Sequence, residues 1–174
     1  KCILVGWITD RGLPTRFYHR FYFPLSDAGT MRYENLTKVL KKITPDMRNE
    51  LYVPGRRYDI LIILKKITDD ICELVCFHKK LDTKVIFDAN VNYYEVWGEF
   101  PVLNTKPTSK QQENAKWLTS KADGVVADSS YIAGICRRYN HNVVFIPDNV
   151  NLNFFRGGKI HENKKKINVI WSGI

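Results

Sequence analysis

Polar and aromatic side chains gather directly after a short apolar run in the middle of the chain. Residues 84–87 (KVIF) have the pattern of a buried strand, and a long loop, Asp88–Lys106, follows it. Amides bond hydroxyl groups and aromatic rings pack on apolar faces, so the loop residues Asp88, Asn90, Asn92 and Tyr93 suit the surface of a sugar or nucleotide site. The alternative is a solvated turn whose aromatic rings only anchor the loop.

A second candidate site lies in the stretch Ala122–Phe155. Its turn, capping and apolar residues predict a strand, a helix and a strand at Gly124–Ala127, Ser130–Tyr139 and Asn142–Ile146. Two strands joined by a helix form a parallel pair, and ligands of parallel sheets lie beyond the carboxyl ends of the strands. We therefore expect Asp128–Ser130 and Pro147–Asn151 at the functional edge of the sheet.

A third candidate follows the first predicted strand, Lys1–Thr9. Gly12, Thr15 and Arg16 occupy the loop that leaves this strand, and Thr15 precedes an aromatic pattern of helical spacing that runs to Gly29. The loop therefore places Gly, Thr and Arg at the carboxyl end of the strand, and Arg16 is equally consistent with simple solvation of the helix start. The spacing G-x-G-x-x-G is missing, which argues against a dinucleotide site.

The remaining pattern alternates strands with helices and indicates an α/β fold, a Rossmann-like three-layer α/β/α sandwich around a mostly parallel sheet. We expect helices at Glu34–Ile43, from Thr68 to Lys80, and at Lys110–Lys121, the last with a capping box formed by Ser109 and Gln112. Tyr58–Leu64 predicts a buried strand. Asp46–Arg57 reads as mostly loop, with a short edge strand at Tyr52-Val53.

Composition narrows the function classes. The chain has 174 residues, 44% of them hydrophobic, but no apolar run near the length of a membrane span and no signal-peptide pattern, so we expect a cytoplasmic protein. The net charge of +9 is consistent with solvated lysines, a phosphate-bearing substrate or peripheral contact with an anionic membrane at the inner face. Without a nucleic-acid motif, nucleic acid is the weakest explanation.

The 4 cysteines are scattered through strand and helix patterns, and we interpret them as reduced, buried side chains. Cys72 and Cys76 lie four apart on a predicted helix, but His78 has the wrong phase to complete a metal site. We therefore predict no metal and no cofactor.

These residues carry a resemblance. ADGVVADSSYIAGICRRYNHNVVFIPDNVNLNFF is similar to the "AD-x-(apolar)-x-x-S", helix, strand and "(I/V)P-(N/D)-(G/N)-V-D" pattern of GT-B fold glycosyltransferases of the bacterial and archaeal family 4-like type. RGLPTRFYHR, KVIFDAN and INVIWSG resemble the first loop, the acceptor-side strand and the first strand of the second domain in that family. Thr15, Asn149 and Asn151 depart from the commoner Ser, Gly and Asp.

The resemblance implies an enzyme that transfers a sugar from a nucleotide-diphosphate sugar to a saccharide or lipid-linked acceptor, as in polysaccharide biosynthesis. It implies an acceptor-side Rossmann-like domain at 1–155, a linker at 156–166 and the first strand of a donor-binding domain at 167–174. It also places Gly12, Thr15, Arg16 and Ser129 toward the donor phosphates, with backbone N–H groups of the first helix start as further donors. Asp88, Asn90, Asn92 and Tyr93 fall on the acceptor side, where Asp88 would be the general base if the reaction inverts; the roles differ in retaining members. Since most donor contacts in that family come from the second domain, we expect this chain by itself to be inactive. The alternative is a non-catalytic Rossmann-type module that binds a nucleotide or phosphate.

Overall fold

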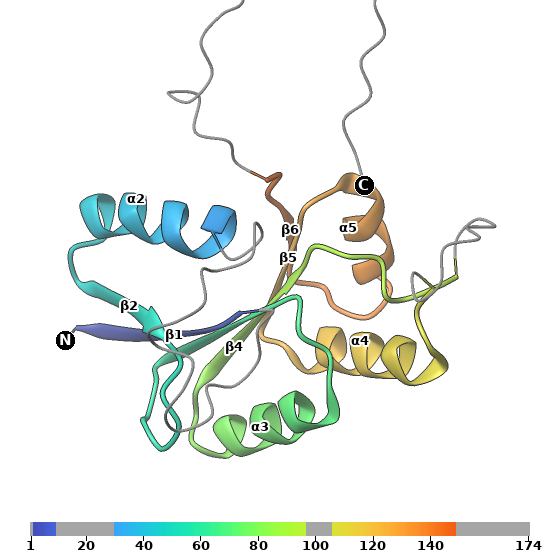
Figure 1. Cartoon of the computed structure of the whole chain (residues 1–174), viewed down its shortest axis with the longest axis horizontal. Coiled ribbons are helices and arrows are strands. Elements are labelled where there is room, and N and C mark those ends of the chain that lie inside the picture. The colour runs from blue at the N-terminus through green and yellow to red at the C-terminus, as the bar shows by residue number, and fades with distance from the viewer. Residues whose placement is uncertain (1, 10–29, 97–105, 149–174) are drawn as a thin grey trace, which may run out of the picture.

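A six-stranded, entirely parallel sheet forms the centre of the computed structural model, which describes residues 2–9, 30–96 and 106–148 (Figure 1). The strand order is β2-β1-β3-β4-β5-β6. The strands are β1 (Ile3–Ile8), β2 (Met47–Leu51), β3 (Ile60–Leu64), β4 (Lys84–Ala89), β5 (Gly124–Ala127) and β6 (Val143–Phe145). The helices are η1 (Thr30–Asn35), a π-helical stretch that leads into α2 (Leu36–Ile43), then α3 (Asp69–Lys80), α4 (Ser109–Lys121) and α5 (Ser130–Cys136).

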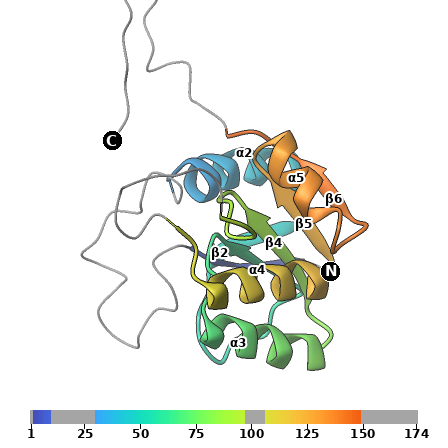
Figure 2. The same cartoon turned by 90° about the vertical axis from the view of Figure 1, so that its right-hand side faces the viewer.

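Helices lie on both faces of the sheet, so the predicted α/β/α layering is confirmed. The buried apolar residues of α3, α4 and α5 belong to one core cluster with Leu61, Phe87 and Val125 of the central strands. Figure 1 shows α2 on the opposite side of the sheet from α3, and Figure 2 shows α3 and α4 side by side. Right-handed crossovers explain why the helices lie on different faces. The connection from β1 to β2 runs toward one edge of the sheet, whereas the connections from β3 to β6 run toward the other edge.

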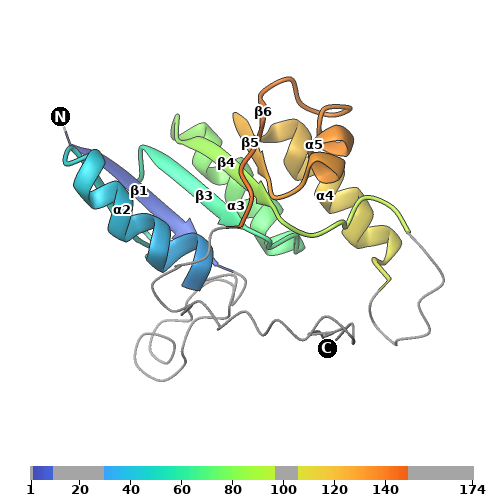
Figure 3. The same ribbon diagram turned by 90° about the horizontal axis from the view of Figure 1, so that it is seen from above.

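The centre of the sheet is apolar on the face that packs against α3, α4 and α5. Leu61, Ile63, Val85, Phe87 and Val125 are each at most 1% exposed, as expected for strands buried by covering helices. All strands point the same way, so their carboxyl ends form one edge (Figure 3). The exit loops of β4, β5 and β6 meet along this edge.

One predicted edge strand is misplaced. The strand at that edge is Met47–Leu51, inside the stretch that reads as loop, and Tyr52-Val53 lies just beyond it. Its polar sequence, MRNEL, is tolerated because an edge strand is half solvated, and the ladder from Ile3↔Met47 to Trp7↔Leu51 fixes its register. Pairing with β1, which no local pattern reveals, decides this element.

Two helix ends differ from expectation. The capping box of α4 is formed by Thr108 and Gln111, one residue before the predicted pair: Gln111 N donates to Thr108 Oγ1 at 3.1 Å and Thr108 N donates to Gln111 Oε1 at 2.9 Å. Helix α5 ends at Cys136 rather than Tyr139. There the side chain of Asn140 donates to the carbonyls of Thr119 and Ala122, each at 2.8 Å, and turns the chain back toward β6.

The cysteines are all free, but only Cys136 is fully buried. Cys72 is half-buried, whereas Cys2 and Cys76 are exposed, so the expectation of four buried side chains is wrong for these three. Cys2 precedes β1 at the start of the chain, and Cys76 lies on the outer face of α3, where neither has a covering element.

Candidate functional site at the carboxyl edge of the sheet

A buried arginine joins three segments at the carboxyl edge. Arg32 of η1 donates from Nη1 to both carboxylate oxygens of Asp88, at 3.0 and 3.1 Å. Its Nε donates to Asp148 Oδ1 at 2.6 Å and its Nη2 to the Ile146 carbonyl at 3.0 Å. The guanidinium thus connects the end of β4 with the turn that leaves β6. Asp88 and Asp148, expected at one edge, do lie together.

Burial makes this cluster electrostatically unusual. Arg32 and Asp88 are each 5% exposed. Desolvation, together with the nearby charges of Asp148 and Asp128, raises the pKa of Asp88 from 3.8 to about 6, even though the charge and hydrogen bonds of Arg32 act in the opposite direction. Desolvation alone would lower the pKa of Arg32, but Asp88 and Asp148 raise it, so the guanidinium stays charged. A carboxyl group that titrates near neutrality is suited to accept or donate a proton.

Unpartnered polar atoms lie next to this pair. In the described part of the chain, Asn90 Oδ1, Asn92 Nδ2 and Asp128 Oδ1 are buried and have no hydrogen-bond partner. Asp88 pairs with Val126 and Ala89 with Ala127 in the ladder, so the residues that leave β4 and β5 are direct neighbours. Buried polar atoms without partners are rare in folded proteins, and each one calls for an explanation. These atoms leave two acceptors and one donor open to the polar groups of a ligand.

The segment after β4 is held in place by aromatic side chains. Tyr94 is 2% exposed, and its hydroxyl lies 2.7 Å from Thr119 Oγ1 and accepts from Cys136 Sγ at 3.2 Å. Its ring stacks on Tyr139 with ring centroids 6.2 Å apart. Asn92 Oδ1 accepts from Tyr94 N at 3.1 Å, which fixes the asparagine from the other side. Asn92 therefore has a defined position before any ligand binds.

The other predicted site residues fall into two groups. Ser129 is the N-cap of α5, where its Oγ accepts from Ile132 N at 3.2 Å, and Tyr93 is partly buried against the core. Phosphate binding by Ser129 stays a prediction. Gly12, Thr15 and Arg16 lie outside the described residues, as do the predicted linker at 156–166 and the strand at 167–174.

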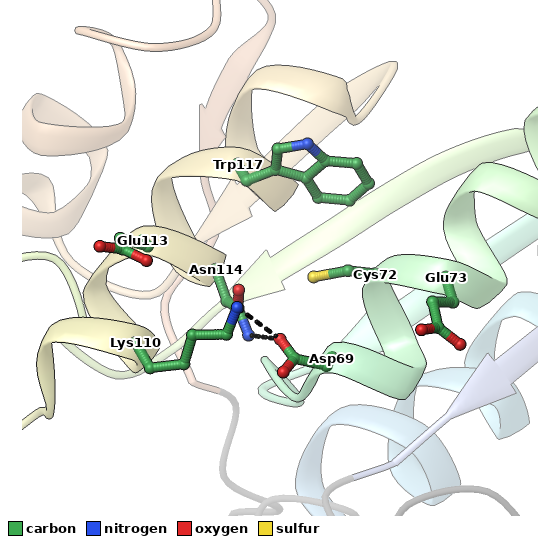
Figure 4. A pocket seen from close by; sticks show the side chains of 7 residues that line it. All are labelled: Asp69, Cys72, Glu73, Lys110, Glu113, Asn114 and Trp117. Carbon is green, nitrogen blue, oxygen red and sulfur yellow. Dashed lines mark hydrogen bonds and ion pairs between the residues drawn. The ribbon is translucent and has the colours of Figure 1, made fainter.

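A separate hollow of about 540 Å³ opens between α3 and α4, where Cys72 and Trp117 point into the space between the helices (Figure 4). Asp69, at the start of α3, accepts from Asn114 at 2.8 Å and pairs with Lys110 at 3.1 Å. Burial raises the pKa of the Cys72 thiol to about 11, so this thiol is protonated near neutrality. The hollow contains no activated nucleophile, and we place the candidate site at the Arg32–Asp88 cluster instead.

Two further observations concern metal binding and membrane spans. Within the described ranges, no group of three or more His, Cys, Asp or Glu is arranged to hold a metal ion. The same part of the chain has no helix of sufficient length and apolar character to span a bilayer.

Fold and site together define a class: a Rossmann-like α/β domain with a buried carboxyl group, paired with an arginine, at the carboxyl edge of its parallel sheet. Comparison with models of known protein families gives no match, and neither does comparison with curated proteins.

Sequence reasoning missed Arg32. It is one of 27 basic residues, it begins no motif, and 56 residues separate it from Asp88. The only signal was the excess of carboxylates expected at the edge, since Asp88, Asp128 and Asp148 placed together require a compensating cation.

Proposed function

We propose that this chain is the acceptor-side half of a nucleotide-sugar-dependent glycosyltransferase. The observation that supports this proposal best is the juxtaposition of a buried Asp88, whose pKa is about 6, with unpartnered polar atoms of Asn90, Asn92 and Asp128. A saccharide offers many hydroxyl groups that both donate and accept hydrogen bonds. The motif resemblance from Ala122 to Phe155 supports the same class.

In this proposal Asp88 accepts the proton of the attacking acceptor hydroxyl. A carboxylate has about four lone-pair sites, and Arg32 uses one on each oxygen, so acceptor capacity remains. Asn90 and Asn92 orient the acceptor through their amides, and the Tyr93 ring packs on an apolar sugar face. Gly12, Thr15, Arg16 and Ser129 face the donor phosphates, while a second domain supplies most donor contacts.

Sugar transfer, assayed with the complete product of the gene that encodes this chain, tests the catalytic role. Asp88→Asn keeps the size of the side chain and an acceptor for Arg32 but removes the base. We expect kcat to fall by at least about 100-fold, with a smaller change in KM for the acceptor. Asp82→Asn is the matched control, because the Asp82 side chain is 99% exposed and belongs to the turn between α3 and β4. An Asp88→Asn enzyme with the activity of the control would exclude the proposed base.

Titration of the 174-residue chain with nucleotides addresses the alternative class. As an acceptor-side half, the chain binds a saccharide detectably by NMR and binds a nucleotide-diphosphate sugar weakly, since most donor contacts are elsewhere. Micromolar binding of the nucleotide sugar by this chain alone would favour a non-catalytic nucleotide-binding module.

A further inference from the structure

Arg32 is unusual because each nitrogen of its guanidinium group donates a hydrogen bond. Two of its nitrogens bind carboxylates and the third binds the Ile146 carbonyl, so the group has one defined orientation. An arginine that merely neutralised charge could do so from the surface with an exposed side chain. This one is buried beside Asp88, where it cannot be replaced by solvent.

The two opposing influences on Asp88 show what this arrangement achieves. Burial favours the protonated acid, while the charge and hydrogen bonds of Arg32 favour the carboxylate. The resulting pKa of Asp88, about 6, lies near neutrality. With the guanidinium removed, burial would act without opposition, and Asp88 would remain protonated at pH 7. A protonated carboxyl group cannot act as a base.

We propose that Arg32 is a positioning residue of the reaction that keeps the Asp88 carboxylate ionised and in a fixed orientation at the carboxyl edge. Asp148, which binds the same guanidinium, weakens this effect. The role of Arg32 in the reaction rests on the proposed function, whereas its control over the ionisation of Asp88 does not.

Within the described ranges, the charged groups around Asp88 come from four segments. Arg32 faces it from η1, Asp148 from the turn after β6, and Asp128 from the turn after β5. Lys65 and Lys66 follow β3 at the same edge, and Lys65 N donates to the Asp88 carbonyl at 3.1 Å. The side chain of Arg32 bonds the carboxylate directly through Nη1. Asp148 competes for the same guanidinium and also repels Asp88, so its charge opposes ionisation.

The test follows the Asp88 carboxyl carbon by NMR during a pH titration of the 174-residue chain. Arg32→Gln is expected to raise the midpoint of the Asp88 titration by at least about one pH unit, whereas Arg32→Lys keeps it closer to that of the unchanged chain. Asp148→Asn removes a repulsive charge at a site with a 44% exposed side chain, so it is expected to fold and to lower the midpoint. This variant keeps the test decisive if Arg32→Gln does not fold.

The corresponding transfer assay reads the acidic limb of the pH profile of kcat/KM. In the complete gene product this limb is expected to move upward with Arg32→Gln and downward with Asp148→Asn, in parallel with the NMR midpoints. An Asp88 midpoint unchanged in both variants would overturn the inference about Arg32. Shifted midpoints with no transfer activity in the unchanged gene product would instead overturn the proposed function, and with it the role of Arg32 in a reaction.

Discussion

Arg32 Nη1 lies 3.0 Å from Asp88 Oδ1 and 3.1 Å from Oδ2, and both side chains are excluded from solvent. A buried pair of this kind adds little net stability compared with apolar residues, but removal of one partner is costly. The pair therefore marks the carboxyl edge as a place where specific chemistry or specific geometry, rather than stability, accounts for the charges.

Removal of the guanidinium is expected to destabilise the fold strongly. In Arg32→Met the side chain retains much of its volume, but Asp88 loses its cation, and we expect a loss of about 3–5 kcal/mol in the free energy of unfolding, measured by urea denaturation near pH 7. Arg48→Met is the control. Arg48 is 68% exposed and lies 3.4 Å from Glu50, so its loss should cost less than about 1 kcal/mol. Equal effects of the two substitutions would contradict the buried-pair interpretation.

The raised pKa of Asp88 predicts a specific pH dependence of stability. Because the folded state holds the Asp88 proton up to about pH 6 and the unfolded state releases it near pH 3.8, the folded state binds more protons in between, and stability falls as pH rises. Asp88→Asn removes this contribution. We expect the stability of the unchanged chain relative to Asp88→Asn to decrease by about 2–3 kcal/mol between about pH 4 and pH 7.

Urea denaturation of both proteins at several pH values measures this difference. The comparison also cancels the effect of His78, which is the same in both proteins. Burial lowers the pKa of His78, so its stabilising contribution is lost as pH falls, opposite to the contribution of Asp88. A relative stability that increases with pH would mean that the carboxyl group is held ionised below its ordinary pKa.

The capping box of α4 predicts different effects on stability for two neighbouring residues, Thr108 and Ser109. Thr108→Ala removes the Oγ1 acceptor of Gln111 N, and we expect a loss of about 1 kcal/mol in the free energy of unfolding. Ser109→Ala, one residue later, removes an exposed hydroxyl inside the first turn and should change stability by less than about 0.5 kcal/mol. Thermal and urea denaturation of the pair decides which residue is the cap, and the reverse order would support the position predicted from sequence.

Substitution by alanine is expected to have opposite effects on stability at Gly6 and at Gly134. A Cβ at Gly6 would lie 2.8 Å from two ring carbons of Tyr58, whose hydroxyl is fixed by Val53 N and Glu50. We expect Gly6→Ala to cost about 1–3 kcal/mol. At Gly134 in α5 a Cβ would meet nothing within 4 Å, so Gly134→Ala should stabilise by roughly 0.5–1 kcal/mol through helix propensity. Melting curves of the two variants give the comparison, and a neutral Gly6→Ala would show that the Tyr58 ring can move.

Much of the architecture follows from local pattern. The apolar runs of β1, β3 and β4 and the caps of α3 and α5 give the order of elements, and strand–helix alternation requires parallel pairing. Parallel pairing in turn gathers Asp88, Asp128 and Asp148 at one edge. These features are predictable because each depends on residues within a few positions of one another.

Only the tertiary structure decides how the acids at this edge are compensated and which strand closes the sheet. Arg32 is 56 residues from Asp88 and 116 from Asp148, and nothing in the spacing of its neighbours distinguishes it from the other cations of the chain. The edge strand Met47–Leu51 is likewise polar and becomes a strand through its ladder to β1. Sequence by itself determines elements whose stability is local, whereas a buried ion pair or an edge ladder depends on which distant groups exclude water together.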